Sequence, residues 1–136
     1  MNKKKKITTV IVAMAMFCMM SISALAATNV VVSLPKDQAW TTKKDVTRTG
    51  NYSYIEASCD SVYPTSGNDN FSKIQSRVVN SSGTLIMKKD YVVLKEGEGY
   101  EELPIKDGYL SLKTVYIQFR GNTSSAAEAV VNYRGK

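Results

Sequence analysis

The sequence predicts an all-β fold: one antiparallel β-sandwich of seven or eight strands, of the immunoglobulin-like or jelly-roll-like type. Three observations support this prediction. Apolar and polar residues alternate with a period of two along most of residues 27–136. Clusters of turn-forming residues recur about every 8–12 residues. No part of this region has the i, i+3, i+4, i+7 pattern of an amphipathic helix. A small β-barrel is the alternative, and the lack of repeats or linkers predicts a single domain over 27–136.

The first strand is predicted before Pro35, because Val30, Val32 and Leu34 share one face and proline ends the pairing. The segment Gln38–Thr42, centred on Trp40, predicts a short second strand.

The third predicted strand is unusually long. Residues Asn51–Tyr63 form a continuous β-rich run. At about 3.3 Å per residue it would reach ~43 Å, too long for a small domain. We therefore expect a bulge or bend at Ser58–Ser61. The following residues, Pro64–Asn70, are rich in Ser, Gly, Asn and Asp and predict a loop.

A hairpin is predicted in the middle of the chain. Phe71–Val79 alternates well and is followed by a turn sequence at Asn80–Gly83. The return strand is expected at Leu85–Lys88, continuing past a bulge to Tyr91–Leu94. A polar loop at 95–101 overlaps a short strand at Tyr100–Ile105, whose proline favours a sheet edge.

The C-terminus predicts a second hairpin around the turn Gly121–Ser124. On the first strand, Val115, Ile117 and Phe119 share one face. On the return strand, Ala127, Ala129, Val131 and Tyr133 share one face. One apolar and one polar face is typical of an antiparallel sheet with a solvated side.

Residues 1–26 predict a secretory signal peptide. Four lysines at 3–6 precede an apolar run from Ile7 to Ile22, and Ala24 and Ala26 form an A-x-A cleavage site. The basic opening resembles export signals of Gram-positive bacteria. We expect cleavage after Ala26 and a secreted, extracellular protein, with loose attachment to the cell wall as a variant. An uncleaved N-terminal anchor is the alternative; residues 27–136 contain no further apolar run of about 18 residues, so no membrane contact is expected after cleavage.

Composition excludes several classes of chemistry. The chain contains 18 Lys+Arg, 12 Asp+Glu and no histidine. Removing the four signal lysines leaves 14 basic and 12 acidic residues, a net charge near +2, which does not favour a nucleic-acid partner. Without histidine, the usual Ser-His-Asp and Cys-His sites and mixed Cys/His zinc sites are excluded. We expect a non-enzymatic protein without a cofactor.

Cys59 is the single cysteine after the signal, so no internal disulfide can form. It is in register with Ile55 and Ala57, which predicts a thiol buried in the core. The alternative is a free thiol that pairs between chains.

Acidic and amide side chains are the candidates for a catalytic or a metal site. Glu96, Glu98, Glu101 and Glu102 are interpreted as a solvated acidic region, because a glycosidase needs two carboxyl groups at a defined separation. Asn68, Asp69 and Asn70 are a weak calcium candidate. They lack the spaced acidic pattern of a calcium loop and are equally typical of an Asx-rich turn.

The aromatic residues suggest a binding function. Tyrosine and tryptophan combine a flat apolar body with a polar tip and suit stacking on sugars or contact with proteins. The candidates for ligand binding are Tyr52, Tyr54, Tyr116 and Trp40, of which the three tyrosines lie opposite the predicted core faces of their strands. Filling of cross-strand positions is the alternative for these side chains.

The sequence thus predicts a secreted, non-catalytic binding module. Its ligand would be a cell-envelope glycan or another extracellular protein, contacted through exposed aromatics and the polar loops 64–70 and 95–101. The alternatives are a small bacteriocin-like toxin and a surface protein that self-assembles into homo-oligomers through its sheet edges.

Overall fold

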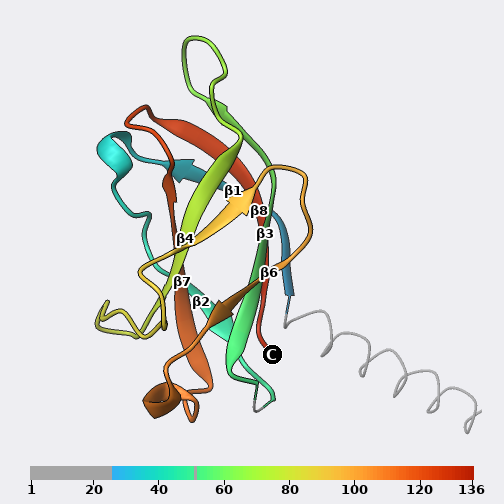
Figure 1. The fold of residues 1–136 in the computed structure, drawn as a ribbon, viewed down its shortest axis with the longest axis vertical. Helices are drawn as coiled ribbons and strands as arrows, with labels where there is room; N and C mark the ends of the chain where they lie inside the picture. Colours follow the sequence, from blue (N-terminus) through green and yellow to red (C-terminus); the bar gives the residue numbers. More distant parts are fainter. Residues whose placement is uncertain (1–25, 51) are drawn as a thin grey trace, which may run out of the picture.

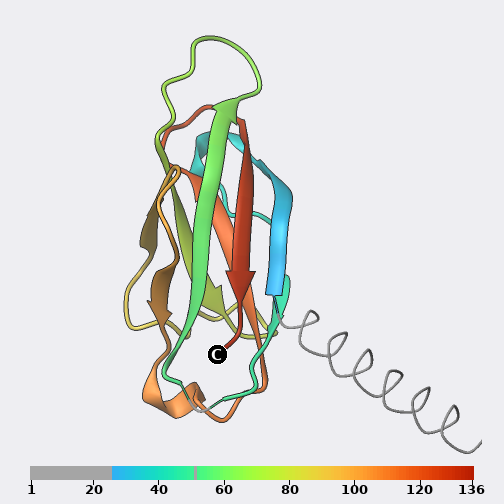
Figure 2. The same cartoon turned by 90° about the vertical axis from the view of Figure 1, so that its right-hand side faces the viewer.

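The computed structural model describes residues 26–50 and 52–136, which form two antiparallel four-stranded sheets (Figures 1 and 2). The predicted all-β sandwich is confirmed. The strands are β1 (Ala26–Leu34), β2 (Lys44–Thr47), β3 (Tyr54–Pro64), β4 (Lys73–Val79), β5 (Val92–Lys95), β6 (Glu101–Pro104), β7 (Thr114–Gly121) and β8 (Ala127–Arg134). Two short 3-10 turns, η1 (Lys36–Gln38) and η2 (Asp107–Tyr109), complete the regular structure of this part of the chain.

The strands pair in a nested order. Sheet A has the order β1-β8-β3-β6 and sheet B the order β2-β7-β4-β5. The first strand therefore pairs with the last, the second with the seventh, the third with the sixth and the fourth with the fifth. Figure 2 shows β1, β8 and β3 side by side. This nesting is the jelly-roll form of the sandwich rather than the immunoglobulin form.

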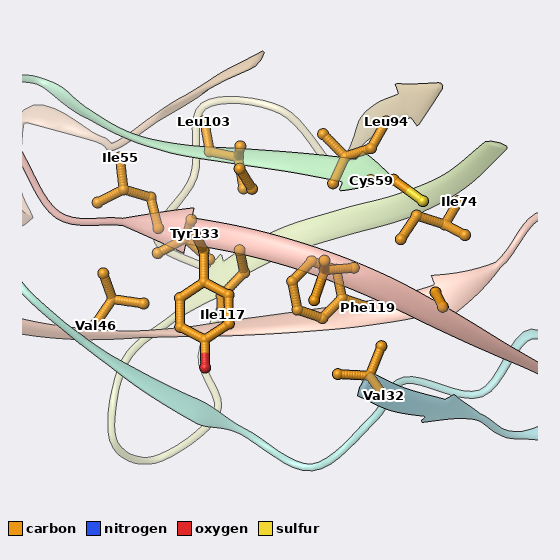
Figure 3. Packing of buried hydrophobic residues seen from close by; sticks show 14 of the residues in the cluster. Val32, Val46, Ile55, Cys59, Ile74, Leu94, Leu103, Ile117, Phe119 and Tyr133 are labelled. Carbon is orange, nitrogen blue, oxygen red and sulfur yellow. The ribbon is translucent and has the colours of Figure 1, made fainter. Parts of the chain in front are cut away.

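The core lies between the two sheets, where the alternating apolar side chains of both sheets meet (Figure 3). On the facing strands β7 and β8, the rings of Phe119 and Tyr133 pack with centroids 6.2 Å apart. The largest fully buried side chains are Phe119, Leu34, Ile55, Ile74, Ile86, Met87, Leu94, Leu103, Ile105, Ile117, Val62 and Val78. One continuous core joins both sheets, so packing alone holds them together without a disulfide.

The long third strand bends where the sequence predicts. The register of β3 against β8 shifts between Cys59 and Ser61, which marks a β-bulge. The short strand β6 lies at the edge of sheet A, and Pro104 ends it, because an edge strand can tolerate a residue without an N–H donor.

One local prediction is wrong and another is only partly right. Gln38–Thr42 is not a strand: Gln38 ends η1, and Trp40 lies in an irregular segment before β2. Asp37 and Gln38 have φ values of 61° and 56°, which are incompatible with a strand. The predicted return strand is right only in its second part. Leu85–Lys88 makes isolated bridges, Val79 with Leu85 and Met87 with Ile105. The predicted continuation Tyr91–Leu94 overlaps β5, which pairs with β4 as the hairpin requires.

The predicted C-terminal hairpin is also wrong. β7 and β8 follow each other in sequence, and each has the predicted inward face, but β7 belongs to sheet B and β8 to sheet A. The connection at residues 122–126 therefore crosses from one sheet to the other. Alternation specifies which face of a strand is buried but not which strand lies beside it.

The predicted signal peptide falls almost entirely outside the described residues. Ala24 lies outside them, and Ala26 is exposed at the first position of β1. Within residues 26–50 and 52–136, no helix is long and apolar enough to cross a membrane.

Candidate functional site

The predicted aromatic residues form two groups on opposite sides of the sandwich. Tyr54 lies on the outer face of β3 in sheet A, with Tyr52 just before it. Tyr116 lies on the outer face of β7 in sheet B, the sheet that Trp40 also covers. A ligand on one flat face of the sandwich cannot contact both groups. The structure therefore divides the four predicted residues into two candidate surfaces.

The first surface, on sheet A, is built around Tyr52 and Tyr54. Their rings meet edge to face with centroids 5.7 Å apart, and the ammonium group of Lys136 lies 5.8 Å from the Tyr52 centroid. Tyr52 is 54% exposed. This surface therefore offers an accessible aromatic pair near the C-terminus.

The cations of this first surface already have an anionic partner. Glu56 lies 2.6 Å from Arg134 and 3.5 Å from Lys136. The guanidinium of Arg134 also stacks on Tyr100, with its central carbon 3.9 Å from the ring centroid. The two cations therefore share one carboxylate partner. Glu102 lies opposite Glu56 in the pairing of β3 with β6, and Arg134 and Lys136 form their salt bridges with Glu56.

The second surface, on sheet B, is centred on Trp40. The guanidinium carbons of Arg77 on β4 and Arg120 on β7 lie 4.3 and 4.4 Å from the centroid of the Trp40 ring. Arg120 is also 5.3 Å from the centroid of Tyr91, which is 40% exposed. We call these four residues the Trp40 cluster. It brings two aromatic rings and two cations from four separate segments together on one sheet face.

Hydrogen bonds to glutamine hold both arginines of the Trp40 cluster. Arg77 lies opposite Gln118 in the pairing of β4 with β7, and its Nε donates to Gln118 Oε1 at 3.0 Å. Arg120 lies opposite Gln75, and its Nε donates to Gln75 Oε1 at 2.5 Å. Each pair spans the two strands directly, because residues in register on an antiparallel pair project from the same face. The strand register therefore sets where the guanidinium groups lie.

A second set of contacts fixes the segment that carries Trp40. Thr41 exchanges two bonds with Phe119: its N–H donates to the Phe119 carbonyl at 2.8 Å, and its Oγ1 accepts from the Phe119 N–H at 3.0 Å. The side-chain amide of Gln118 donates to the Thr41 carbonyl at 2.8 Å. Trp40 thus follows β7 closely although it belongs to no strand.

Electrostatics distinguish the Trp40 cluster from the first surface. Burial lowers the pKa of Arg77, and the neighbouring charge of Arg120 lowers it further. The salt bridges within the described residues involve Lys88, Arg134 and Lys136, and none involves Arg77 or Arg120. Two like charges therefore lie close together without a carboxylate partner from this part of the chain.

Other basic and aromatic groups extend the same face. The ammonium of Lys43 lies 5.4 Å from the centroid of Tyr116 and donates to the Ser81 carbonyl. Asp45 lies opposite Tyr116 in the pairing of β2 with β7 and is exposed. The face thus carries basic and aromatic groups together with two acidic residues, Asp45 on β2 and Asp90, which precedes Tyr91 in sequence.

The thiol of Cys59 is fully buried in the core, as the alternation predicts. Burial, with smaller contributions from the charges of Glu96 and Asp60, raises its pKa to about 12. A thiol with this pKa is protonated at neutral pH and is a poor nucleophile. In this conformation it is also inaccessible to a second chain.

The calcium candidate consists of exposed residues in the loop between β3 and β4, seen at the top of Figure 1. Asp69 Oδ1 accepts a hydrogen bond of 3.0 Å from the N–H of Phe71, the geometry of an Asx turn. Within residues 26–50 and 52–136, no group of three or more acidic or cysteine side chains comes together to hold a metal. Among the acidic residues, Glu96 accepts a hydrogen bond of 3.0 Å from the N–H of Val62.

The structure also has two open depressions, neither of which is lined by a residue of the Trp40 cluster. One, of about 280 Å³, is lined by residues of the connections that follow β1, β3 and β7. The other, of about 140 Å³, is lined by Arg48 and by the segment after η2. Both are smaller than typical sites that enclose a small molecule. A flat sheet face is therefore the better candidate for ligand contact.

Sequence reasoning identified Trp40 but missed its partners Arg77, Arg120 and Tyr91. Alternation places Arg77 on the polar side of β4 and Arg120 on the polar side of β7. The missing information was that these strands are neighbours. Comparison with models of known protein families, with curated proteins and with solved structures found no match to this chain.

Proposed function

We propose that this protein is a secreted, non-catalytic binding module that contacts a cell-envelope glycan through the Trp40 cluster on the outer face of sheet B. The observation that carries this proposal is the convergence of Trp40, Tyr91, Arg77 and Arg120 on one sheet face. Aromatic rings supply flat apolar area for sugar rings, and fixed polar groups around them supply directional hydrogen bonds.

The order of the side chains around Trp40 supports a binding role. Hydrogen bonds hold Gln75 and Gln118, and β7 holds Thr41 beside the indole. Groups that are already ordered lose little conformational entropy when a ligand binds. The Trp40 cluster therefore suits recognition better than a flexible loop does.

Sheet B is favoured over sheet A because of the charge balance. On sheet A, Glu56 binds both Arg134 and Lys136, so those cations are occupied. On sheet B, no salt bridge within the described residues engages Arg77 or Arg120, which leaves their charge for a ligand.

The test is retention of purified residues 27–136, which keep the whole core, on isolated Gram-positive cell walls. We expect saturable retention that Trp40→Ala weakens at least about tenfold, because the substitution removes the aromatic centre of the site. Tyr52→Ala is the matched control, since it removes an exposed aromatic from the opposite surface. Circular dichroism and thermal melting must show that both variants fold. Loss of retention in Tyr52→Ala but not in Trp40→Ala would transfer the site to sheet A.

A second candidate function is self-assembly through the edge of sheet A. β1 is nine residues long and lies at that edge, and Val31 on it is 59% exposed. Exposed apolar edge strands favour pairing between chains. Light scattering over a range of concentrations tests this candidate, and Val31→Lys should suppress any association. A monomer at every concentration would refute it.

A further inference from the structure

We propose that the Trp40 cluster recognises an oxyanion on the bound glycan, either a phosphate or a carboxylate group. Arg77 and Arg120 bind this group through their terminal nitrogens. This inference rests on the proposed function for the identity of the polymer. The geometry of the two guanidinium groups is the basis for the chemical class of the bound group, an oxyanion.

The first argument concerns which nitrogens are already engaged. Each arginine uses its Nε to bond a glutamine on the neighbouring strand, Gln118 for Arg77 and Gln75 for Arg120. Within residues 26–50 and 52–136, no hydrogen bond involves the terminal Nη atoms of either arginine. A guanidinium held in this way keeps its two Nη groups for an oxyanion, which it can bind with two parallel bonds.

The second argument concerns the placement of the two groups. Both guanidinium carbons lie within 4.4 Å of the centroid of the same indole ring. The register of β4 with β7 places the two arginines at diagonal positions on the same sheet face, within reach of one ligand. The hydrogen bonds from each Nε to a glutamine and the contact with the indole restrain the guanidinium groups, and the register of β4 with β7 sets the positions of their backbones. An oxyanion between the forks would meet donors that are already oriented.

The third argument is the contrast with Arg134 on the other sheet. Arg134 also stacks on an aromatic ring, Tyr100, but its guanidinium pairs with Glu56 at 2.6 Å. Arg77 and Arg120 have the same aromatic support without the carboxylate. Their mutual repulsion is consistent with the lowered pKa of Arg77. A bound anion would take the place that Glu56 occupies beside Arg134.

The charges on the rest of the face fit an extended anionic ligand. Lys43 over Tyr116 adds a third cation on sheet B. The acidic side chains near this face are Asp45, opposite Tyr116, and Asp90, next to Tyr91 in sequence, and neither forms a salt bridge with a described residue. A polymer with repeated anionic groups can engage both arginines while its sugars cover the rings.

Trp40 supplies the assay, because it is the single tryptophan of the chain and stands at the centre of the site. Its emission can be followed while residues 27–136 are titrated with poly(glycerol phosphate), polygalacturonate or neutral dextran. We expect the charged polymers to change the emission with saturation and dextran to leave it unchanged. The two charged polymers distinguish a phosphate ligand from a carboxylate ligand. Tenfold higher salt should weaken binding by about tenfold or more, because each engaged anion releases counterions.

Variants test whether the arginine forks are responsible. The double variant Arg77→Gln, Arg120→Gln should bind the charged polymer at least about tenfold more weakly. Arg134→Gln removes one stacked arginine from sheet A, and Lys106→Gln removes one exposed charge. Both controls should stay within about twofold of the wild type. Substitution of Arg77 and Arg120 by lysine should restore only part of the affinity, since an ammonium group cannot form the fork.

Several results would overturn the inference. These are tight binding of dextran, no response to any polymer, unchanged affinity in the double variant, and full recovery by lysine. The inference and the proposed function fail separately. If the double variant is retained on cell walls as strongly as the wild type, the proposal of glycan binding stands and the proposal of an oxyanion site is wrong. If the wild type binds charged polymers but not walls, the oxyanion site stands and the envelope ligand is wrong.

Discussion

Arg48 holds together the end of the sandwich where η2 lies, at the bottom of Figure 1. It follows β2 and is only 4% exposed. Its Nη1 donates to the carbonyls of Leu110 and Leu112 at 2.9 and 3.0 Å, and its Nη2 donates to the carbonyl of Tyr52. No carboxylate within the described residues pairs with it. One buried cation therefore joins the segment after η2 to the segment before β3.

The substitution Arg48→Met keeps the volume and removes the donors. A hydrogen bond from a charged donor contributes about 1.5–3 kcal/mol, and three such bonds are lost. Two effects offset part of this loss. The buried guanidinium no longer has to be desolvated, which costs several kcal/mol per buried ion. The buried Nε, which has no partner, also disappears. We expect a net loss of about 3 kcal/mol in the free energy of unfolding.

Urea unfolding followed by Trp40 fluorescence and by circular dichroism would measure this loss. A change of about 3 kcal/mol also lowers Tm by roughly 10–20 °C in a domain of this size. The free energy of unfolding of Arg48→Lys should lie between those of the wild type and Arg48→Met, because one ammonium group cannot reach all three carbonyls. Lys106→Met, at an exposed position, is the control and should change stability little. A loss below about 0.5 kcal/mol in Arg48→Met would refute the view that this cation organises the end of the sandwich.

Four further predictions concern Cys59, Gly135 and Asn80. Because burial raises the pKa of Cys59 to about 12, a thiol reagent should label the native protein far more slowly than the urea-unfolded protein. Because the pKa of Cys59 is higher in the folded than in the unfolded state, the protonated thiol stabilises the fold fully below the unfolded pKa of about 8.5, and this stabilisation is lost as pH rises toward 12. The Tm of a Cys59→Ala variant should therefore fall less between neutral and alkaline pH than the Tm of the wild type. Gly135→Ala would place a Cβ 1.8 Å from the Thr47 carbonyl oxygen, so we expect the last two residues to detach, with proteolysis of the C-terminus as the measurement and intact resistance as the contrary result. Asn80→Ala removes an acceptor that serves two backbone N–H groups of its turn, and thermal melting should show a loss of about 1 kcal/mol; an unchanged Tm would contradict the role of this turn.

The sequence patterns predicted the faces of the strands better than their partners. Val115, Ile117 and Phe119 point into the core as expected, and so do Ala127 and Ala129. The two strands nevertheless belong to different sheets. A period of two reflects burial on one side, and this burial is the same whether the next strand lies beside it or across the core. Pairing depends on contacts distant in sequence, which one sequence does not specify.

The same limit explains what was missed at the candidate site. The excess of aromatic residues indicated a binding surface but could not show that Tyr52 and Tyr116 lie on opposite faces. The sequence predicts a short strand at Gln38–Thr42 around Trp40. The positive φ angles of Asp37 and Gln38 end that possibility, and Thr41 attaches to β7 instead. Arg77 and Arg120 can be recognised as members of one site only when β4 and β7 are known to be adjacent.

The nested strand order also constrains when the chain can fold. β1 pairs along its length with β8, so Leu34 needs Ala127 as its partner, and the C-terminal end of β1 cannot complete its sheet until the last strand is available. Folds dominated by such distant contacts form in about milliseconds to seconds, more slowly than helical bundles. A nascent chain that still lacks β8 therefore cannot complete sheet A, in which β8 lies between β1 and β3. If the protein is exported as proposed, this delay keeps it in a translocation-competent state until synthesis is nearly complete, and the sandwich closes on the far side of the membrane.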